Sequence, residues 1–112
     1  MKQTSHQFIA EVFKGLSHST RLMILEHLQS GEKSVNELTA ALDIDQPLVS
    51  QQLINLRNRN IVLTRREGTT IFYRVRDETL FELLAITRII FKNHLIDTKA
   101  MLDQLASDEI SD

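Results

Sequence analysis

The sequence contains no cysteine among its 112 residues. This absence excludes disulfide bonds, thiolate metal sites and thiol redox sensing, and it is typical of proteins from a reducing compartment. The N-terminal segment MKQTSHQF lacks the apolar region of a signal peptide, and no uninterrupted apolar run approaches the length of a membrane span. We therefore expect a cytoplasmic protein with no membrane partner.

Proline and glycine are also scarce, with one and three residues. No internal repeat, low-complexity tract or flexible linker interrupts the chain, and a hydrophobic content of 42% is enough for a buried core. We therefore predict a single domain over residues 1–112. The sequence has no Ser/His/Asp grouping, no paired carboxylates with a pocket signature and no glycine-rich phosphate loop, so we expect neither an enzyme nor a cofactor.

Positive charge is concentrated in one segment, although the net charge is −2. Residues 1–56 hold four Lys/Arg and six Asp/Glu, a net charge of −2. Residues 57–76 hold six arginines against Glu67, a net charge of +5, and residues 77–112 hold three basic and eight acidic side chains, a net charge of −5. Nucleic-acid binding depends on the local field rather than on the total charge, so residues 57–76 are a candidate phosphate-binding surface.

Apolar residues recur at helical spacing in four segments before residue 60, and capping residues mark where the segments begin. The first predicted helix covers about residues 5–16. Thr20 is the expected N-cap of the second helix, which Gly31 ends. Ser34 and Glu37 form a capping box at the start of a short third helix. Asp45 is the expected N-cap of the fourth.

The period changes after the fourth helix. The runs IVLTRR and TIFYRVR are rich in β-branched and aromatic residues and are joined by EGT, which predicts a β-hairpin over residues 61–76. Asp77 can then cap a long helix over about residues 78–105. Its apolar residues cover more of its circumference than one side of a small domain needs, so we expect a homodimer. The expected interface residues lie on the first and last helices and are Phe8, Val12, Leu84, Ile90 and Phe91.

The fourth helix, residues 46–59, carries hydrogen-bonding groups where a surface helix usually carries charge. Its apolar residues Val49, Leu53 and Leu56 share one face. A three-residue turn, residues 43–45, joins it to the third helix, which predicts a helix-turn-helix with the hairpin as a wing. Its outward amides and hydroxyl can donate hydrogen bonds to base edges and accept them, which favours a face that reads the DNA groove. The alternative interpretation is a polar face that contacts only water. The outward residues are Gln46, Ser50, Gln51, Asn55 and Asn58.

The predicted fold class is therefore mainly α (α+β), a winged helix-turn-helix of about five helices with a two-stranded hairpin. Three motifs in the sequence resemble the ArsR-type (ArsR/SmtB) winged-helix repressors, over roughly residues 8–76. The motifs are LSHSTRLMIL, QPLVSQQL and RREGTTIFYR. The resemblance implies a homodimer joined by the first and last helices, an imperfect palindromic operator in double-stranded DNA, and repression that an inducer relieves.

The resemblance also assigns roles to individual residues. It places helix 46–59 in the major groove, with Gln46, Ser50 and Gln51 at groove-facing positions. It places wing 61–76 on the flanking backbone or in the minor groove. The wing residues expected there are Arg65, Arg66 and Thr69, with Arg57 and Arg59 as further phosphate contacts at the end of the helix. Phe72 and Tyr73 are expected to pack within the hairpin rather than stack on bases.

The metal sites of this family are not complete in the sequence. Some members bind metals through cysteines on the helix before the turn, but that stretch here is SVNELTAAL. Other members bind metals across the dimer on the last helix. His94 and Asp97 reproduce one pair of that site, while the other pair falls on Phe81 and Leu83, which cannot bind a metal. Because a closed tetrahedral site needs four ligands, we expect no metal site beyond this half-site.

Two alternatives remain open at this point. A winged helix can also serve as a protein-interaction module that does not bind DNA, although apolar anchors would then be expected where this helix carries amides. Within DNA binding, the switch could be an unidentified small organic inducer or a partner protein acting at the dimer helices. The residues do not choose between such a switch and constitutive binding.

Overall fold

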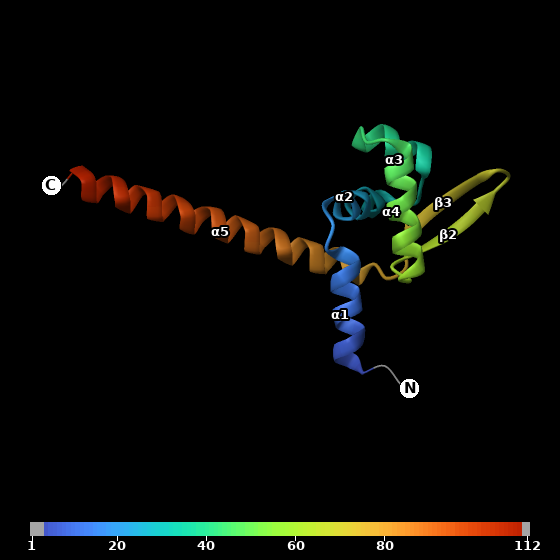
Figure 1. The fold of residues 1–112 in the computed structure, drawn as a ribbon, viewed down its shortest axis with the longest axis horizontal. Coiled ribbons are helices and arrows are strands. Elements are labelled where there is room, and N and C mark those ends of the chain that lie inside the picture. Colours follow the sequence, from blue (N-terminus) through green and yellow to red (C-terminus); the bar gives the residue numbers. More distant parts are fainter. Residues whose placement is uncertain (1–3, 111–112) are drawn as a thin grey trace. The chain divides into compact units, whose positions relative to one another are not determined.

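The computed structural model describes residues 4–110, and the chain divides into two compact units, Met1–Glu78 and Thr79–Asp112. The first unit contains every element except the last helix (Figure 1). The predicted five helices and hairpin are confirmed. In chain order the elements are α1 (Ser5–Leu16), α2 (Ser19–His27), the 3₁₀ turn η1 (Leu28–Ser30), β1 (Lys33–Ser34), α3 (Val35–Leu42), α4 (Gln46–Asn58), β2 (Val62–Glu67), β3 (Thr70–Val75) and α5 (Thr79–Ile110).

The turn between α3 and α4 has the predicted length of three residues. Asp43 adopts a left-handed conformation with φ of 52°, and its N–H donates to the carbonyl of Thr39. A short polar side chain tolerates this conformation better than most others. The predicted capping box of α3 is also confirmed, because Ser34 Oγ accepts from the N–H of Glu37 and Glu37 Oε1 accepts from the N–H of Ser34. Together these features fix where α3 begins and where it ends.

The predicted starts of α2 and α5 need correction, and the predicted cap of α4 is confirmed only in its position. Thr20 does not cap α2, because the helix begins one residue earlier and His18 Nδ1 accepts the N–H of Thr20 at 3.1 Å. Asp45 is the N-cap of α4, as predicted, but its carboxylate makes no capping hydrogen bond. The last helix begins at Thr79 rather than directly after Asp77, and it continues to Ile110.

The hairpin belongs to a three-stranded antiparallel sheet in the order β1-β3-β2. Val62 pairs with Val75 and Glu67 with Thr70, which leaves a two-residue loop, residues 68 and 69. Gly68 has φ of +61°, the positive value that the first position of a tight type II′ hairpin turn requires. The edge strand β1 was not predicted, since two residues are too short to show an alternating pattern.

The core of the first unit is formed by apolar side chains from α2, α3, α4 and β2. The largest fully buried side chains are Ile24, Leu25, Leu38, Val49, Leu53, Leu56 and Val62. Tyr73 and Val75 on β3 are also buried, and alternation along the strands places them on the same face of the sheet as Val62. The predicted packing role of Tyr73 is confirmed.

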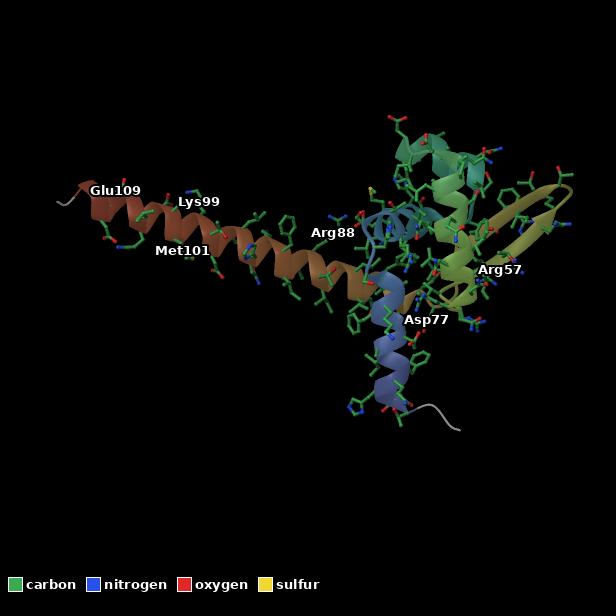
Figure 2. All side chains as sticks on the ribbon, in the orientation of Figure 1. Arg57, Asp77, Arg88, Lys99, Met101 and Glu109 are labelled. Carbon is green, nitrogen blue, oxygen red and sulfur yellow. The ribbon has the colours of Figure 1, made fainter. Side chains whose placement is uncertain are left out.

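The second unit is the single helix α5, 32 residues long. Side chains stand off the ribbon along its whole length, Lys99 and Met101 among them (Figure 2). Within the described residues, no helix combines the length and the apolar character needed to cross a membrane. The exposed large apolar residues of α5 are Ile86, Ile89, Ile90, Phe91, Leu95, Ile96, Met101, Leu102 and Leu105.

Candidate nucleic-acid interface

The helix α4 has two chemically distinct faces. Val49, Leu53 and Leu56 are completely buried, which confirms the predicted inner face. On the other side, Gln51 and Asn58 are exposed, as is Gln46 in the first turn, whereas Ser50 and Asn55 are half-buried at the flanks. The helix therefore presents amide groups at its surface while its apolar face is fully used by the core.

A buried glutamine that was not singled out in the sequence holds α4 in place. Gln52 is 7% exposed, and its Oε1 accepts a hydrogen bond of 2.7 Å from Arg21 Nε. Arg21 Nη1 lies 3.3 Å from the carbonyl oxygens of both Lys14 and Gly15, near the end of α1. One guanidinium thus joins α1, α2 and α4. The sequence did contain a signal for the burial of Gln52, because position 52 lies on the same helical stripe as Val49 and Leu56.

The exit from α4 into the wing has a defined geometry. Asn60 adopts the left-handed conformation with φ of 60°. The N–H of Asn60 donates to the carbonyl of Arg57, and the N–H of Ile61 donates to the carbonyl of Leu56. These two bonds form a Schellman motif, which satisfies carbonyls that the helix end would leave unpaired. The N–H of Arg76 donates to the carbonyl of Ile61, so the base of the hairpin is fixed to the same point.

Arg65 is engaged within the protein. Its Nε donates to Glu32 Oε2 at 3.2 Å and its Nη1 to Glu67 Oε2 at 3.0 Å, while its Nη2 also donates to Glu32. Its guanidinium carbon lies 4.7 Å from the ring centroid of Phe72, a cation–π distance that agrees with the predicted packing role of this ring. The hydrogen bonds from Arg65 lower the pKa of Glu32, and those to Glu32 and Glu67 raise the pKa of Arg65.

Arg66 differs from its neighbour. It is exposed and forms no ion pair with another described residue. Side chains alternate along a strand, so Arg66 lies on the hairpin face that carries Val62, while Arg65 lies on the opposite face. Nearer the base of the hairpin, the Val62 face packs into the core. The charge of Arg66 is therefore available for a ligand.

The two arginines at the end of α4 divide in the same way. Arg59 Nη1 forms an ion pair of 3.2 Å with Glu11 Oε2, and its Nε lies 3.5 Å from Asn55 Oδ1. Arg57, labelled in Figure 2, is exposed and makes no ion pair within residues 4–110. Thr69 is exposed in the hairpin loop. The structure thus brings the predicted cations to one helix and one wing but leaves Arg57 and Arg66 as the unpaired ones.

The predicted half-site for a metal lies on α5. His94 and Asp97 are one turn apart and exposed. Across the part of the chain that the structure describes, no three His, Cys, Asp or Glu side chains come together as a metal-binding group. The half-site therefore gains no third ligand from the described residues of the protomer.

Comparison with known proteins connects this arrangement to a family. Residues 18–64 match the family model for bacterial regulatory proteins of the arsR family. A biofilm growth-associated repressor from Agrobacterium fabrum is 47% identical over 83 residues, which cover 74% of this chain and 71% of the repressor. The chain belongs to the arsR family of bacterial regulatory proteins.

Solved structures show the same fold as this arsR-family protein. The transcriptional repressor BigR from Xylella fastidiosa is 43% identical, with a TM-score of 0.69 over 74% of this chain and 85% of the BigR chain. A homodimeric winged helix-turn-helix DNA-binding domain from Mycobacterium bovis is 30% identical, with a TM-score of 0.70 over 85% of this chain and 93% of that domain. The predicted winged helix-turn-helix is confirmed, with a third strand added to its sheet.

The arginine that joins three helices of the arsR-family protein gives a first prediction. Arg21→Met keeps the apolar stem but removes the hydrogen bonds to Gln52 and to the two α1 carbonyls. Hydrogen bonds to a charged group contribute roughly 1.5–3 kcal/mol, so we expect the free energy of unfolding to fall by about 2 kcal/mol in urea titrations. Arg57→Met is the matched control, and it should change stability by less than about 0.5 kcal/mol. Equal effects of the two substitutions would contradict a structural role for Arg21.

The Arg65–Glu32 pair gives a prediction about pH. Because the pKa of Glu32 is lower in the folded protein than its usual value of 4.5, the pair stabilises the fold above that value and loses its effect as the pH falls through the folded pKa. We expect Glu32→Gln to have a lower thermal midpoint than the wild type at pH 7. The difference should shrink as the pH falls through the lowered pKa of Glu32 in the folded protein, where its carboxylate becomes neutral. A difference that shrank nowhere below pH 4.5, down to acid unfolding, would contradict the pair.

Proposed function

We propose that this arsR-family protein is a sequence-specific transcriptional repressor that binds a palindromic DNA operator as a homodimer. The proposal rests chiefly on the surface of α4, whose amide-bearing face is exposed while Val49, Leu53 and Leu56 hold the helix from the other side. Glutamine and asparagine pair well with adenine in the major groove, which is wide enough for a helix. In this arrangement α4 enters the groove and the wing contacts the flanking backbone or minor groove.

The paired and unpaired arginines of α4 and the wing have different roles in this proposal. Arg66 and Arg57, without ion pairs among the described residues, bind phosphates. Arg65, held by Glu32 and Glu67, mainly fixes the shape of the wing. The net field at the wing is weaker than the sequence count suggests, because Glu32 lies outside residues 57–76 but neutralises charge within them.

The terminal helices supply the dimer interface. Phe8 and Phe13 on α1 are 60% and 52% exposed, and Ile90 and Phe91 on α5 are 62% and 60% exposed. Exposed apolar surface on this scale is typical of surfaces that a partner covers. Val12 is half-buried and Leu84 is 7% exposed, so these two predicted residues have less surface to offer a partner. The homodimeric state of the similar domain from Mycobacterium bovis supports the same assembly here.

The DNA-binding roles can be separated by measuring salt dependence. Gln51→Ala should weaken binding to a selected operator by about 1–3 kcal/mol and change binding to scrambled DNA much less, because only one sequence satisfies its amide. Arg66→Ala should weaken binding to both duplexes about equally and lower the salt slope by about one, the value for one lost phosphate contact. Affinities on both duplexes across a salt series, measured by fluorescence anisotropy, test this.

Arg65→Ala is the matched control, since it removes the same charge from the adjacent position. We expect a smaller change in its salt slope than for Arg66→Ala, because Glu32 and Glu67 already neutralise its charge. If Gln51→Ala weakened both duplexes alike while a wing arginine set the sequence preference, the roles of helix and wing would be reversed. If no variant changed DNA binding, the surface would be a protein-interaction module instead.

The dimer interface is tested at α5. Phe91→Glu places a charge within the proposed apolar interface, where an unpaired charge costs several kcal/mol, on the order given for buried ions. We expect monomers in analytical ultracentrifugation at concentrations where the wild type is a dimer. Gln29→Glu adds the same charge outside α1 and α5 and should leave the dimer intact. An unchanged dimer for Phe91→Glu would place the interface elsewhere.

A further inference from the structure

One apolar residue lies among the amides on the outer face of α4. Ile54 is 48% exposed, although it directly follows Leu53, which is completely buried. Each residue turns a helix by about 100°, so Ile54 is on the same face as Ser50 and Gln51, which precede it by four and three residues, and Asn58, which follows it by four. Val49, Leu53 and Leu56 already fill the core-facing side of α4, so the core does not need Ile54.

The chemistry of the major groove offers a partner for such a side chain. The C5-methyl of thymine is the one apolar group that an unmodified base pair presents there. Isoleucine is β-branched and has essentially one χ1 rotamer in a helix, so little side-chain entropy is lost when it makes a contact. The flanking amides of Gln51 and Asn58 suit adenine, the complement of thymine, so all three side chains can read the same class of base pair.

We propose that Ile54 contacts a thymine methyl group in each operator half-site and thereby discriminates thymine from bases that lack this methyl. The proposal rests on the DNA-binding function proposed above and identifies the chemical group that part of α4 reads. Leu48 is the other exposed large apolar residue of α4, at 40% exposure, but it lies about 120° around the helix from Ile54. It is therefore outside the stripe formed by Ser50, Gln51 and Ile54.

The test uses a duplex that the wild-type protein selects from a random pool. Each thymine is replaced in turn, in both half-sites, by deoxyuridine, which lacks only the methyl group. Burial of one methyl-sized group corresponds to about a fourfold change in affinity per half-site. We therefore expect one symmetric pair of substitutions to weaken wild-type binding by roughly tenfold to twentyfold, with the other substitutions having smaller effects.

The protein variants identify the side chain that senses the methyl. Ile54→Ala should bind the thymine duplex more weakly and lose most of the deoxyuridine penalty at that position. Ile54→Val should retain most of it. Leu48→Ala, the same truncation class on the same helix, should show the full penalty. When thymine replaces deoxyuridine at that position again, affinity should recover only for proteins with a β-branched side chain at residue 54. These are the wild type, Ile54→Val and Leu48→Ala.

The outcomes distinguish a failure of this inference from a failure of the proposed function. If no thymine is sensitive to methyl removal, or if the penalty persists undiminished in Ile54→Ala, the inference is overturned while sequence-specific binding stands. If Leu48→Ala abolishes the penalty and Ile54→Ala does not, the contact belongs to Leu48 and the inference is likewise overturned. If the wild-type protein selects no sequence from the pool, the proposed function fails and this inference fails with it.

Discussion

The hydrogen bonds of Arg21 are the interaction on which the geometry of the DNA-binding surface depends. A recognition helix can present one face only if its other face is fixed, and apolar packing alone, which is not directional, leaves more freedom to slide or rotate than hydrogen bonds do. Arg21 removes this freedom by donating at once to Gln52 on α4 and to two carbonyls near the end of α1. A buried polar group that loses its partner is costly, so the position of α4 relative to α1 is fixed within the first unit.

Electrostatics in the wing follow from which arginines are already paired. Glu32 is not part of the positive segment, yet it neutralises Arg65 across the sheet, and Glu11 pairs with Arg59 in the same way. A cation that is held by carboxylates gains less from a phosphate than one that faces only water, because the existing pair must first be broken. Of the four arginines predicted to contact DNA, Arg57 and Arg66 therefore keep their charge free of ion pairs among the described residues.

Local features of the fold could be predicted from the sequence because their signals are local. The capping box at Ser34, the three-residue turn and the glycine-bearing hairpin each lie within a few residues. Contacts between distant residues could not be predicted in this way. Gln52 and Arg21 are 31 residues apart, and Arg65 and Glu32 are 33 residues apart. The strand β1 exists only because β3 pairs with it, and His18 caps α2 through a side chain less often used for this purpose.

We propose that α4 reads DNA with its outer amides while its inner amide remains structural. The side-chain NH₂ signals of a ¹⁵N-labelled protein report on this directly, because Gln51 and Asn58 are exposed whereas Gln52 is buried in the same helix. When a selected duplex is added, we expect the side-chain signals of Gln51 and Asn58 to shift and the signal of Gln52 to stay unchanged. Unchanged signals for Gln51 and Asn58, together with shifts confined to residues outside α4 and the wing, would contradict it.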